Sequence, residues 1–167
     1  MDMTLYLAFF AATTVMIVLP GPSVMLTVAH ALRHGWRRSL VTVSGATLGV
    51  AVQIAITIAG MASFMLVLAD GFEWLRWGGV FYLLYIGVRQ WRADPDLEPA
   101  DSPPASRRSL FLQGLVVTIA NPKSFLFLVA FIPQFIDPNA PLALQFSIMF
   151  PTFLAITFVF TGAWGVL

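Results

Sequence analysis

Cysteine is absent from the 167-residue chain, so disulfide bridges and thiolate metal sites are excluded. Charged residues are also scarce: they make up 10% of the sequence, whereas an ordinary soluble domain carries about 25%. Hydrophobic residues reach 59%, and a soluble fold has no interior large enough for so much apolar surface. These shortages predict a protein whose solvent is the lipid bilayer.

Groups that carry other chemistries are missing as well. The formal net charge is +1 and there is no long basic run, so we expect no nucleic-acid partner. The sequence contains no glycine-rich phosphate loop, no Ser–His–acid set and no cluster with metal-ligand spacing. We therefore expect no metal, no cofactor and no catalytic residue.

Long hydrophobic runs are what the sequence has instead. A helix needs roughly 20 apolar residues to cross about 30 Å of hydrocarbon. The runs are continuous rather than alternating, which favours helices over a β-barrel. We predict an all-α polytopic membrane helix bundle with five transmembrane helices, at residues 4–32, 39–69, 72–88, 110–132 and 142–167. The third is the weakest, and its alternative is a re-entrant or surface-lying helix.

Arginine residues predict the orientation. Residues 70–73 and 133–141 contain no lysine or arginine, whereas the loops after the first and third runs are basic. The positive-inside rule therefore places these basic loops in the cytoplasm of a bacterial cell and the N-terminus outside its inner membrane. The basic residues concerned are Arg33, Arg37, Arg38, Arg89, Arg92, Arg107 and Arg108.

Prolines interrupt the first and the fourth runs. Pro20-Gly21-Pro22 breaks one and Asn121-Pro122-Lys123 breaks the other. Paired broken helices in matching positions are the best sequence indicator of a transporter's midplane binding site. The alternative is that the prolines merely kink membrane helices.

The matched breaks also predict an internal repeat. If each half has three spans, an odd number, the second half enters the membrane from the opposite side. We therefore interpret residues 1–167 as a single transmembrane domain with an incomplete 3+3 inverted repeat. The first repeat covers residues 1–92, a Pro- and acid-rich connector covers 93–109, and the incomplete second repeat covers 110–167.

Each break would expose backbone polar groups within the lipid. Pro22 and Pro122 donate no backbone hydrogen bond, so carbonyls one turn earlier lose their partners, and Gly21 frees the chain to bend. The resumed half-helix carries partial positive charge at its N-terminus and attracts a carboxylate. The freed carbonyls suit an ammonium group. We predict that Pro20, Gly21, Pro22, Asn121 and Pro122 bind an amino acid or a similar small zwitterion.

Lys123 is the only lysine of the chain and the only charge well inside a predicted span. An unpaired charge at the bilayer centre costs at least about 2.5–3.5 kcal/mol on insertion scales. No acidic residue stands at comparable depth, so we predict that Lys123 holds the substrate carboxylate or relays a proton. The alternatives are that Lys123 extends to an interface and that Asn121 only caps the half-helix.

The second run contains two further signals. Gln53 is its one strongly polar deep side chain, and it either lines the cavity or bonds a neighbouring helix. Gly45 and Gly49 form a small-xxx-small pattern that lets helix backbones approach closely. We expect these glycines to pack within the monomer, and a homo-oligomer is the alternative.

At these motifs the sequence resembles the LysE/RhtB family of amino-acid exporters, the lysine-exporter and homoserine/threonine-resistance type. The resemblance covers nearly the whole chain in order and spacing. It implies secondary export of amino acids or their derivatives, driven by the proton-motive force. It rests on Leu19-Pro20-Gly21-Pro22, Arg37-Arg38 leading to Gly45 and Gly49, Tyr82-Leu83, Tyr85-Ile86-Gly87 and Asn121-Pro122-Lys123.

The sequence departs from this family in its length. Family members usually have about six spans, whereas this sequence stops at Leu167 inside a hydrophobic run. A truncated, non-transporting membrane protein is therefore the first alternative hypothesis. A membrane-embedded enzyme is the second, although Lys123 and Asn121 are a poor catalytic set.

Overall fold

The computed structural model describes residues 2–64 and 105–166. Helices dominate this part of the chain, and it contains no strand, as predicted from the continuous apolar runs. The third predicted span and the Tyr82–Gly87 motifs lie outside the described residues. The helices are α1 (Met3–Val18), α2 (Pro22–His34), α3 (Trp36–Phe64), α5 (Arg107–Ile119), α6 (Pro122–Phe131), the 3-10 helix η1 (Ile132–Phe135) and α7 (Leu142–Trp164).

Two helices are each long and apolar enough to cross a membrane alone. These are Trp36–Gly60 within α3, with 25 residues, and α7, with 23 residues. Two more spans arise if each bent helix pair counts as one: α1 with α2, bent by 55°, and α5 with α6 and η1, bent by 53°. The prediction of a helical membrane bundle with broken first and fourth helices is therefore confirmed.

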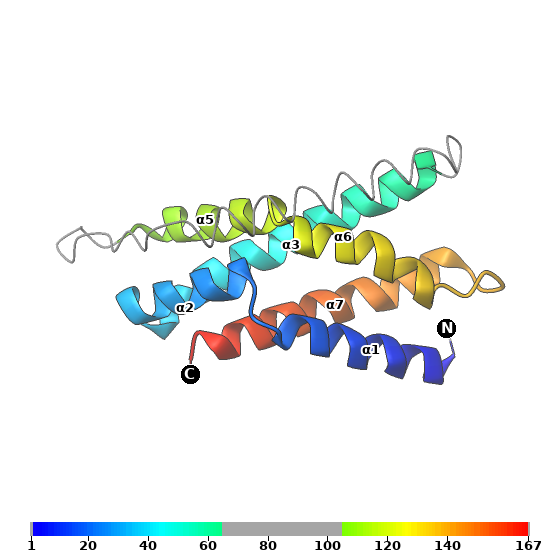
Figure 1. Ribbon diagram of the computed structural model, residues 1–167, viewed down its shortest axis with the longest axis horizontal. Helices are drawn as coiled ribbons and strands as arrows, with labels where there is room; N and C mark the ends of the chain where they lie inside the picture. Colours follow the sequence, from blue (N-terminus) through cyan, green and yellow to red (C-terminus); the bar gives the residue numbers. More distant parts are fainter. Residues whose placement is uncertain (1, 65–104, 167) are drawn as a thin grey trace.

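The broken spans run in opposite directions through the bundle. In Figure 1, α1 and α2 lead from the end that carries the N-terminus to the far end, and α5 and α6 return. The unbroken helices α3 and α7 are likewise antiparallel. Opposite directions of matching elements are what an inverted repeat requires. The proposed limits of the two repeats stay a prediction.

Helix α5 begins at Arg107, earlier than the predicted start at Leu110. Ser106 is the physical reason, because its side-chain oxygen accepts a hydrogen bond from the Ser109 backbone N–H at 3.1 Å. This N-cap satisfies a donor that the helix leaves free, and it extends the helix into the polar connector.

Glycines bring α3 and α5 into close contact. A Cβ added at Gly45 would collide with the carbonyl of Phe111, and one at Gly114 would collide with the carbonyl of Thr42. At Gly49 an added Cβ would lie 2.8 Å from the Thr118 Cβ. The small-xxx-small pattern therefore faces α5 of the same chain, and it joins a helix of the first half to the first helix of the second half.

Aromatic packing forms the core beside the breaks. Phe9 of α1 lies 5.9 Å from Phe131 and 5.5 Å from Phe135, measured between ring centroids. Gln145 of α7, fully buried, anchors the adjacent loop: its amide donates to the carbonyls of Asp137 and Ala140 and accepts from the Asp137 N–H. These contacts fix the end of the bundle at which α6, η1 and α7 meet.

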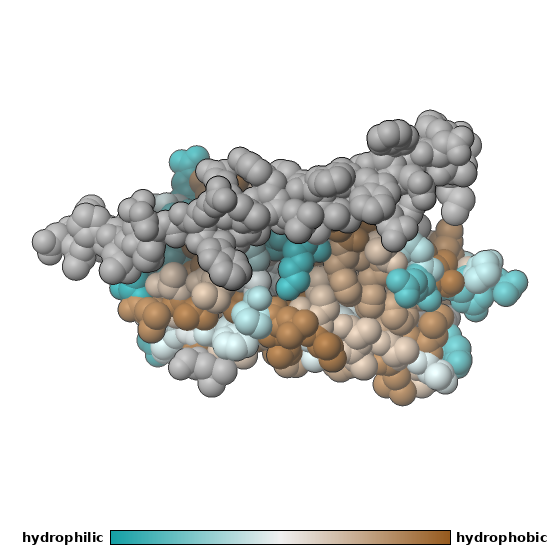
Figure 2. Space-filling model, in the orientation of Figure 1, coloured by the Kyte–Doolittle hydropathy of each residue, from teal (hydrophilic) through white to brown (hydrophobic). Residues whose placement is uncertain are grey.

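The outside of the bundle is apolar. Large hydrophobic side chains that are more than half exposed include Leu7, Val15, Met25, Leu32 and Val159. Figure 2 shows hydrophobic residues over most of the described part of one face. In water such a surface would aggregate, whereas lipid solvates it, so the exterior agrees with a multi-pass membrane protein.

Candidate functional site

The first break leaves carbonyl groups without helical partners. Helix α1 ends at Val18, where the Leu19 N–H still donates to the Val15 carbonyl at 3.3 Å. Pro20 and Pro22 have no N–H, so the carbonyls of Met16 and Val18 lose the donor that continuous helix would supply. The C-terminal end of α1 therefore presents backbone carbonyl groups that can accept a hydrogen bond.

The start of α2 leaves donors free. Gly21 is the N-cap residue, in extended backbone, and no side chain caps the helix. Pro22 occupies the first helical position, where its missing N–H costs nothing. The N–H groups of Ser23 and Val24 belong to the first turn, where a helix has no internal acceptors. This end is the positive pole of α2.

The second break is built differently, because it has a side-chain cap. Asn121 accepts a hydrogen bond from the Lys123 backbone N–H on its Oδ1 at 3.1 Å. Its carbonyl accepts from the Ser124 hydroxyl at 3.1 Å and from the Phe125 N–H at 3.2 Å. Asn121 therefore caps α6, one of the roles that the sequence left open for it.

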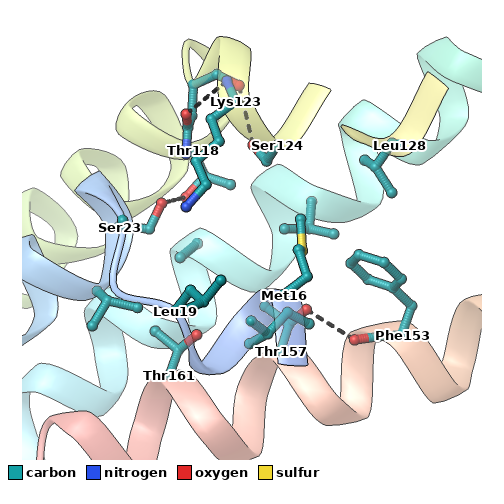
Figure 3. Close-up of a pocket in the computed structure, with 16 residues that line it drawn as sticks. Met16, Leu19, Ser23, Thr118, Lys123, Ser124, Leu128, Phe153, Thr157 and Thr161 are labelled. Carbon is teal, nitrogen blue, oxygen red and sulfur yellow. Dashed lines mark hydrogen bonds between the residues drawn. The ribbon is translucent and has the colours of Figure 1, made fainter. Parts of the chain in front are cut away.

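The two breaks meet each other near the middle of the bundle (Figure 1). The hydroxyls of Ser23 and Thr118 lie 2.9 Å apart, so a hydrogen bond joins the start of α2 to the end of α5. The Lys123 ammonium nitrogen would lie 3.9 Å from a Cβ at Gly21. Figure 3 shows Lys123 extending beside Ser23 and Thr118, across the space between the half-helices.

A cavity of about 80 Å³ lies between the breaks, with α3 and α7 as further walls. It holds roughly two to three waters at about 30 Å³ each. Lys123 is the only ionisable group among its lining residues in the described part of the chain. The lining residues are Met16, Ile17, Leu19, Gly21, Ser23, Val24, Ala46, Val50, Thr118, Asn121, Lys123, Ser124, Leu128, Phe153, Thr157 and Thr161.

Three of the predicted site residues line this cavity: Gly21, Asn121 and Lys123. The prolines of both breaks shape the backbone but are not lining residues. Lys123 is exposed at its break rather than enclosed among apolar side chains. The matched breaks therefore converge on one space.

Gln53 is not a lining residue, and it takes the second of the two roles that the sequence left open. Its side chain is 1% exposed, and its amide nitrogen donates to the carbonyls of Thr118 at 2.7 Å, Asn121 at 3.2 Å and Ile119 at 3.3 Å. Gln53 therefore joins α3 to the backbone of the second break by hydrogen bonds.

Several lining residues were not predicted from the sequence. Thr157 and Thr161 lie one turn apart on α7 and bring hydroxyls to the wall opposite the breaks (Figure 3). The Thr157 hydroxyl donates to the Phe153 carbonyl at 2.9 Å. Hydroxyls at four-residue spacing in an apolar span were the available signal, but such residues commonly bond their own helix, as Thr157 does.

Two broken helices whose ends surround one cavity, inside a bundle with an apolar exterior, are the architecture of a secondary transporter. Residues 14–167 match the family model described as LysE type translocator, and the chain belongs to this family. The predicted family is therefore confirmed. Members of this family are translocators, which also confirms the prediction that the protein is not an enzyme.

The curated relatives include named efflux proteins. The homoserine/homoserine lactone efflux protein of Salmonella typhimurium is 30% identical over 155 residues, 92% of this chain and 75% of the relative. The leucine efflux protein of Klebsiella pneumoniae is 28% identical over 144 residues, 81% of this chain and 65% of the relative. An uncharacterized membrane protein of Vibrio cholerae is 31% identical over 150 residues, 89% of this chain and 73% of the relative. No solved structure matches the chain.

Proposed function

We propose that this protein exports amino acids or their derivatives across the bacterial inner membrane, in exchange for protons. The observation that carries the proposal is the meeting of both helix breaks and the Lys123 ammonium at one cavity. Efflux relatives named for homoserine and leucine support a small amino acid as the substrate.

The charges of a zwitterion match the groups around the cavity. The substrate carboxylate binds between the Lys123 ammonium and the uncapped N-terminus of α2, where the Ser23 and Val24 N–H groups are free of a capping side chain. The ammonium group binds toward the free carbonyl of Met16, which is a lining residue. Leu128 and Phe153 leave an apolar wall for the side chain.

The size of the cavity implies that transport requires movement. A volume of about 80 Å³ is smaller than the ~150 Å³ cavity that holds a benzene molecule in another protein. The Ser23–Thr118 hydrogen bond closes the space between the two half-helices. We propose that this bond opens and reforms during alternating access, as one broken helix moves against the other.

Lys123 is also the group to which we assign proton coupling, because it is the one ionisable lining residue within residues 2–64 and 105–166. In an exchange, Lys123 would take up its proton from outside the cell and release it to the cytoplasm, while the substrate moves in the opposite direction. Arginine could not replace it in this role, since its guanidinium stays protonated.

Transport into inverted membrane vesicles tests the proposal directly. With a lumen made acidic by respiration, labelled homoserine and leucine are expected to accumulate above equilibrium, and an uncoupler should abolish the accumulation. Accumulation driven by a sodium gradient instead would remove proton coupling and leave export standing. Vesicles that contain the inserted protein but accumulate neither compound would contradict export of these amino acids.

We further propose that the N-terminus is outside the cell. The described basic residues outside the cavity gather at the end where α2 ends and α3 and α5 begin, whereas the two described carboxylates, Asp2 and Asp137, lie at the opposite end (Figure 1). The Arg37 guanidinium lies 5.3 Å from the centroid of the Trp36 ring, a pairing suited to a membrane interface. The basic residues are Arg33, His34, Arg37, Arg38, Arg107 and Arg108.

Single cysteines can test this orientation, because the chain has none of its own. In intact spheroplasts an impermeant maleimide is expected to label Asn139→Cys, in the loop before α7, and to leave Ala105→Cys, before α5, unlabelled. Permeabilised cells should show both sites reacting. The reverse pattern in intact spheroplasts would refute the proposed orientation.

A further inference from the structure

Gln53 connects the two halves of the bundle at the second break. It projects from α3, and its amide nitrogen lies 2.7 Å from the Thr118 carbonyl oxygen and 3.2 Å from that of Asn121. Its side chain is 1% exposed. Pro122 has no N–H, so the Thr118 carbonyl cannot receive the hydrogen bond of a continuous helix. The Thr118 carbonyl accepts from the Asn121 N–H at 3.0 Å, and Gln53 supplies a further donor in place of the one that the proline removes.

The first break has no equivalent of this contact. Within the described residues, no side chain donates to the carbonyls that Pro20 and Pro22 leave free, those of Met16 and Val18. The two breaks therefore match in position but differ in chemistry. The first presents free carbonyls, and the second presents an ammonium group with its carbonyls already bonded.

The orientation of the Gln53 amide follows from this chemistry. Its Oε1 is buried and has no hydrogen-bond partner. Turning the amide over would place this oxygen against the carbonyl oxygens of Thr118, Ile119 and Asn121 and would lose every bond that they receive. A buried acceptor without a partner is unfavourable, so simple filling of space does not account for a glutamine here, where methionine would fit without that cost.

The contact lies on a rigid part of the bundle. Gly49, one turn before Gln53, lets α3 approach α5 so closely that an added Cβ would lie 2.8 Å from the Thr118 Cβ and 3.0 Å from the Leu115 oxygen. The end of α5 is therefore held against α3 just where its carbonyls meet the glutamine. This packing fixes the distance between Gln53 and the break.

We infer that Gln53 is a positioning residue: it donates to the carbonyls of Thr118, Ile119 and Asn121, so that the second break offers the cavity the Lys123 ammonium and none of these backbone carbonyls in a free state. The inference rests on the proposed amino-acid site. It implies a fixed polarity for the bound substrate, with the carboxylate toward Lys123 and the ammonium group toward the free carbonyls at the end of α1. Gln53 acts on the substrate through Asn121 and Lys123 and does not touch it.

Gln53→Met tests the inference, because methionine has a similar length and cannot donate. In proteoliposomes the KM for homoserine is expected to rise about tenfold, the effect of losing a buried hydrogen bond at the carboxylate end. Homoserine lactone, which has the ammonium group but no free carboxylate, should change by less than about twofold on the same reasoning. Gln113→Met, at an exposed glutamine of α5 bonded to Ser109, is the matched control.

A glutamine that merely stabilises the fold would lower the amount of active protein and leave both KM values unchanged, and this result would overturn the inference. An equal rise for both compounds would also overturn it, because the effect would then not follow the carboxylate. These outcomes leave export by the wild-type protein intact, so they separate the inference from the proposed function.

A second measurement does not depend on transport. Ser124→Cys places a thiol on the cavity wall, next to the break that Gln53 bonds. Gln53→Met should change the rate of its reaction with a small charged thiol reagent severalfold, whereas Gln113→Met should not. If the wild-type protein exports no amino acid but the reactivity changes, positioning of the break stands and the proposed function fails. Unchanged reactivity counts against the positioning role itself.

Discussion

Lys123→Met should lower the initial rate of homoserine accumulation in inverted vesicles by about 30-fold or more. Losing a charge-assisted hydrogen bond to the substrate carboxylate costs about 1.5–3 kcal/mol, and each 1.4 kcal/mol corresponds to about a factor of ten. Lys123 is the only ionisable lining residue in the described part of the chain, so no described neighbour can take its place. Its side chain is exposed at the break, so insertion and stability should change little.

Two control variants test whether the effect is specific to the position and the proton of Lys123. Arg108→Met removes an exposed cation at the end of the bundle, away from the cavity lining, and should leave accumulation near the wild-type rate. Lys123→Arg keeps the charge but cannot release a proton, so it should exchange labelled for unlabelled homoserine without net accumulation. Undiminished accumulation by Lys123→Met would remove Lys123 from the mechanism.

Both breaks could be predicted from the sequence because proline acts through covalent structure. A proline removes one helical N–H donor wherever it lies. Prolines flanked by glycine or asparagine end one helix and begin the next here, whereas Pro151 lies inside the continuous helix α7. The bends of 55° and 53° fall at the predicted residues for this reason. Matching positions in the two halves also predicted that the breaks would lie close together, and the Ser23–Thr118 bond shows this proximity.

The role of Gln53 could not be predicted in the same way, because it depends on the distance between helices. An amide inside an apolar span can face a cavity or a neighbouring backbone, and the sequence does not distinguish these cases. Gly49 decides between them by holding α3 against α5 one turn before Gln53. Helix packing therefore determines which polar side chains remain available to a ligand.

The contribution of α7 was missed for a related reason. Its apolar composition predicts a span, but Thr157 and Thr161 face the cavity only because α7 packs against α1 and α3. Periodicity locates the hydroxyls on one face of a helix without indicating what that face contacts. The half-helix ends are local features that sequence can identify, whereas the opposite wall is a product of tertiary packing.

Gly21→Leu should reduce export by about a hundredfold while membrane insertion and the melting temperature stay unchanged. A loss of this size is expected when a substrate is displaced by about 1 Å. Gly21 has extended backbone, with φ −130°, which any residue adopts, so its importance is not conformational. A Cβ at this position meets only the Lys123 ammonium nitrogen, at 3.9 Å, an ordinary contact. A leucine side chain would extend further, into a cavity of about 80 Å³.

A graded series separates a binding site from a structural glycine. Gly21→Ala adds only the tolerated Cβ and should retain most of the export rate, whereas Gly21→Leu should show the loss of about a hundredfold at an unchanged melting temperature in detergent. Gly60→Leu is the matched control, since nothing lies within 4 Å of a Cβ at that glycine. If Gly21→Ala and Gly21→Leu reduced export equally, the role of the glycine would lie in the backbone conformation. If Gly21→Leu exported normally, the substrate would not pass between Gly21 and Lys123, because the leucine would occupy that space.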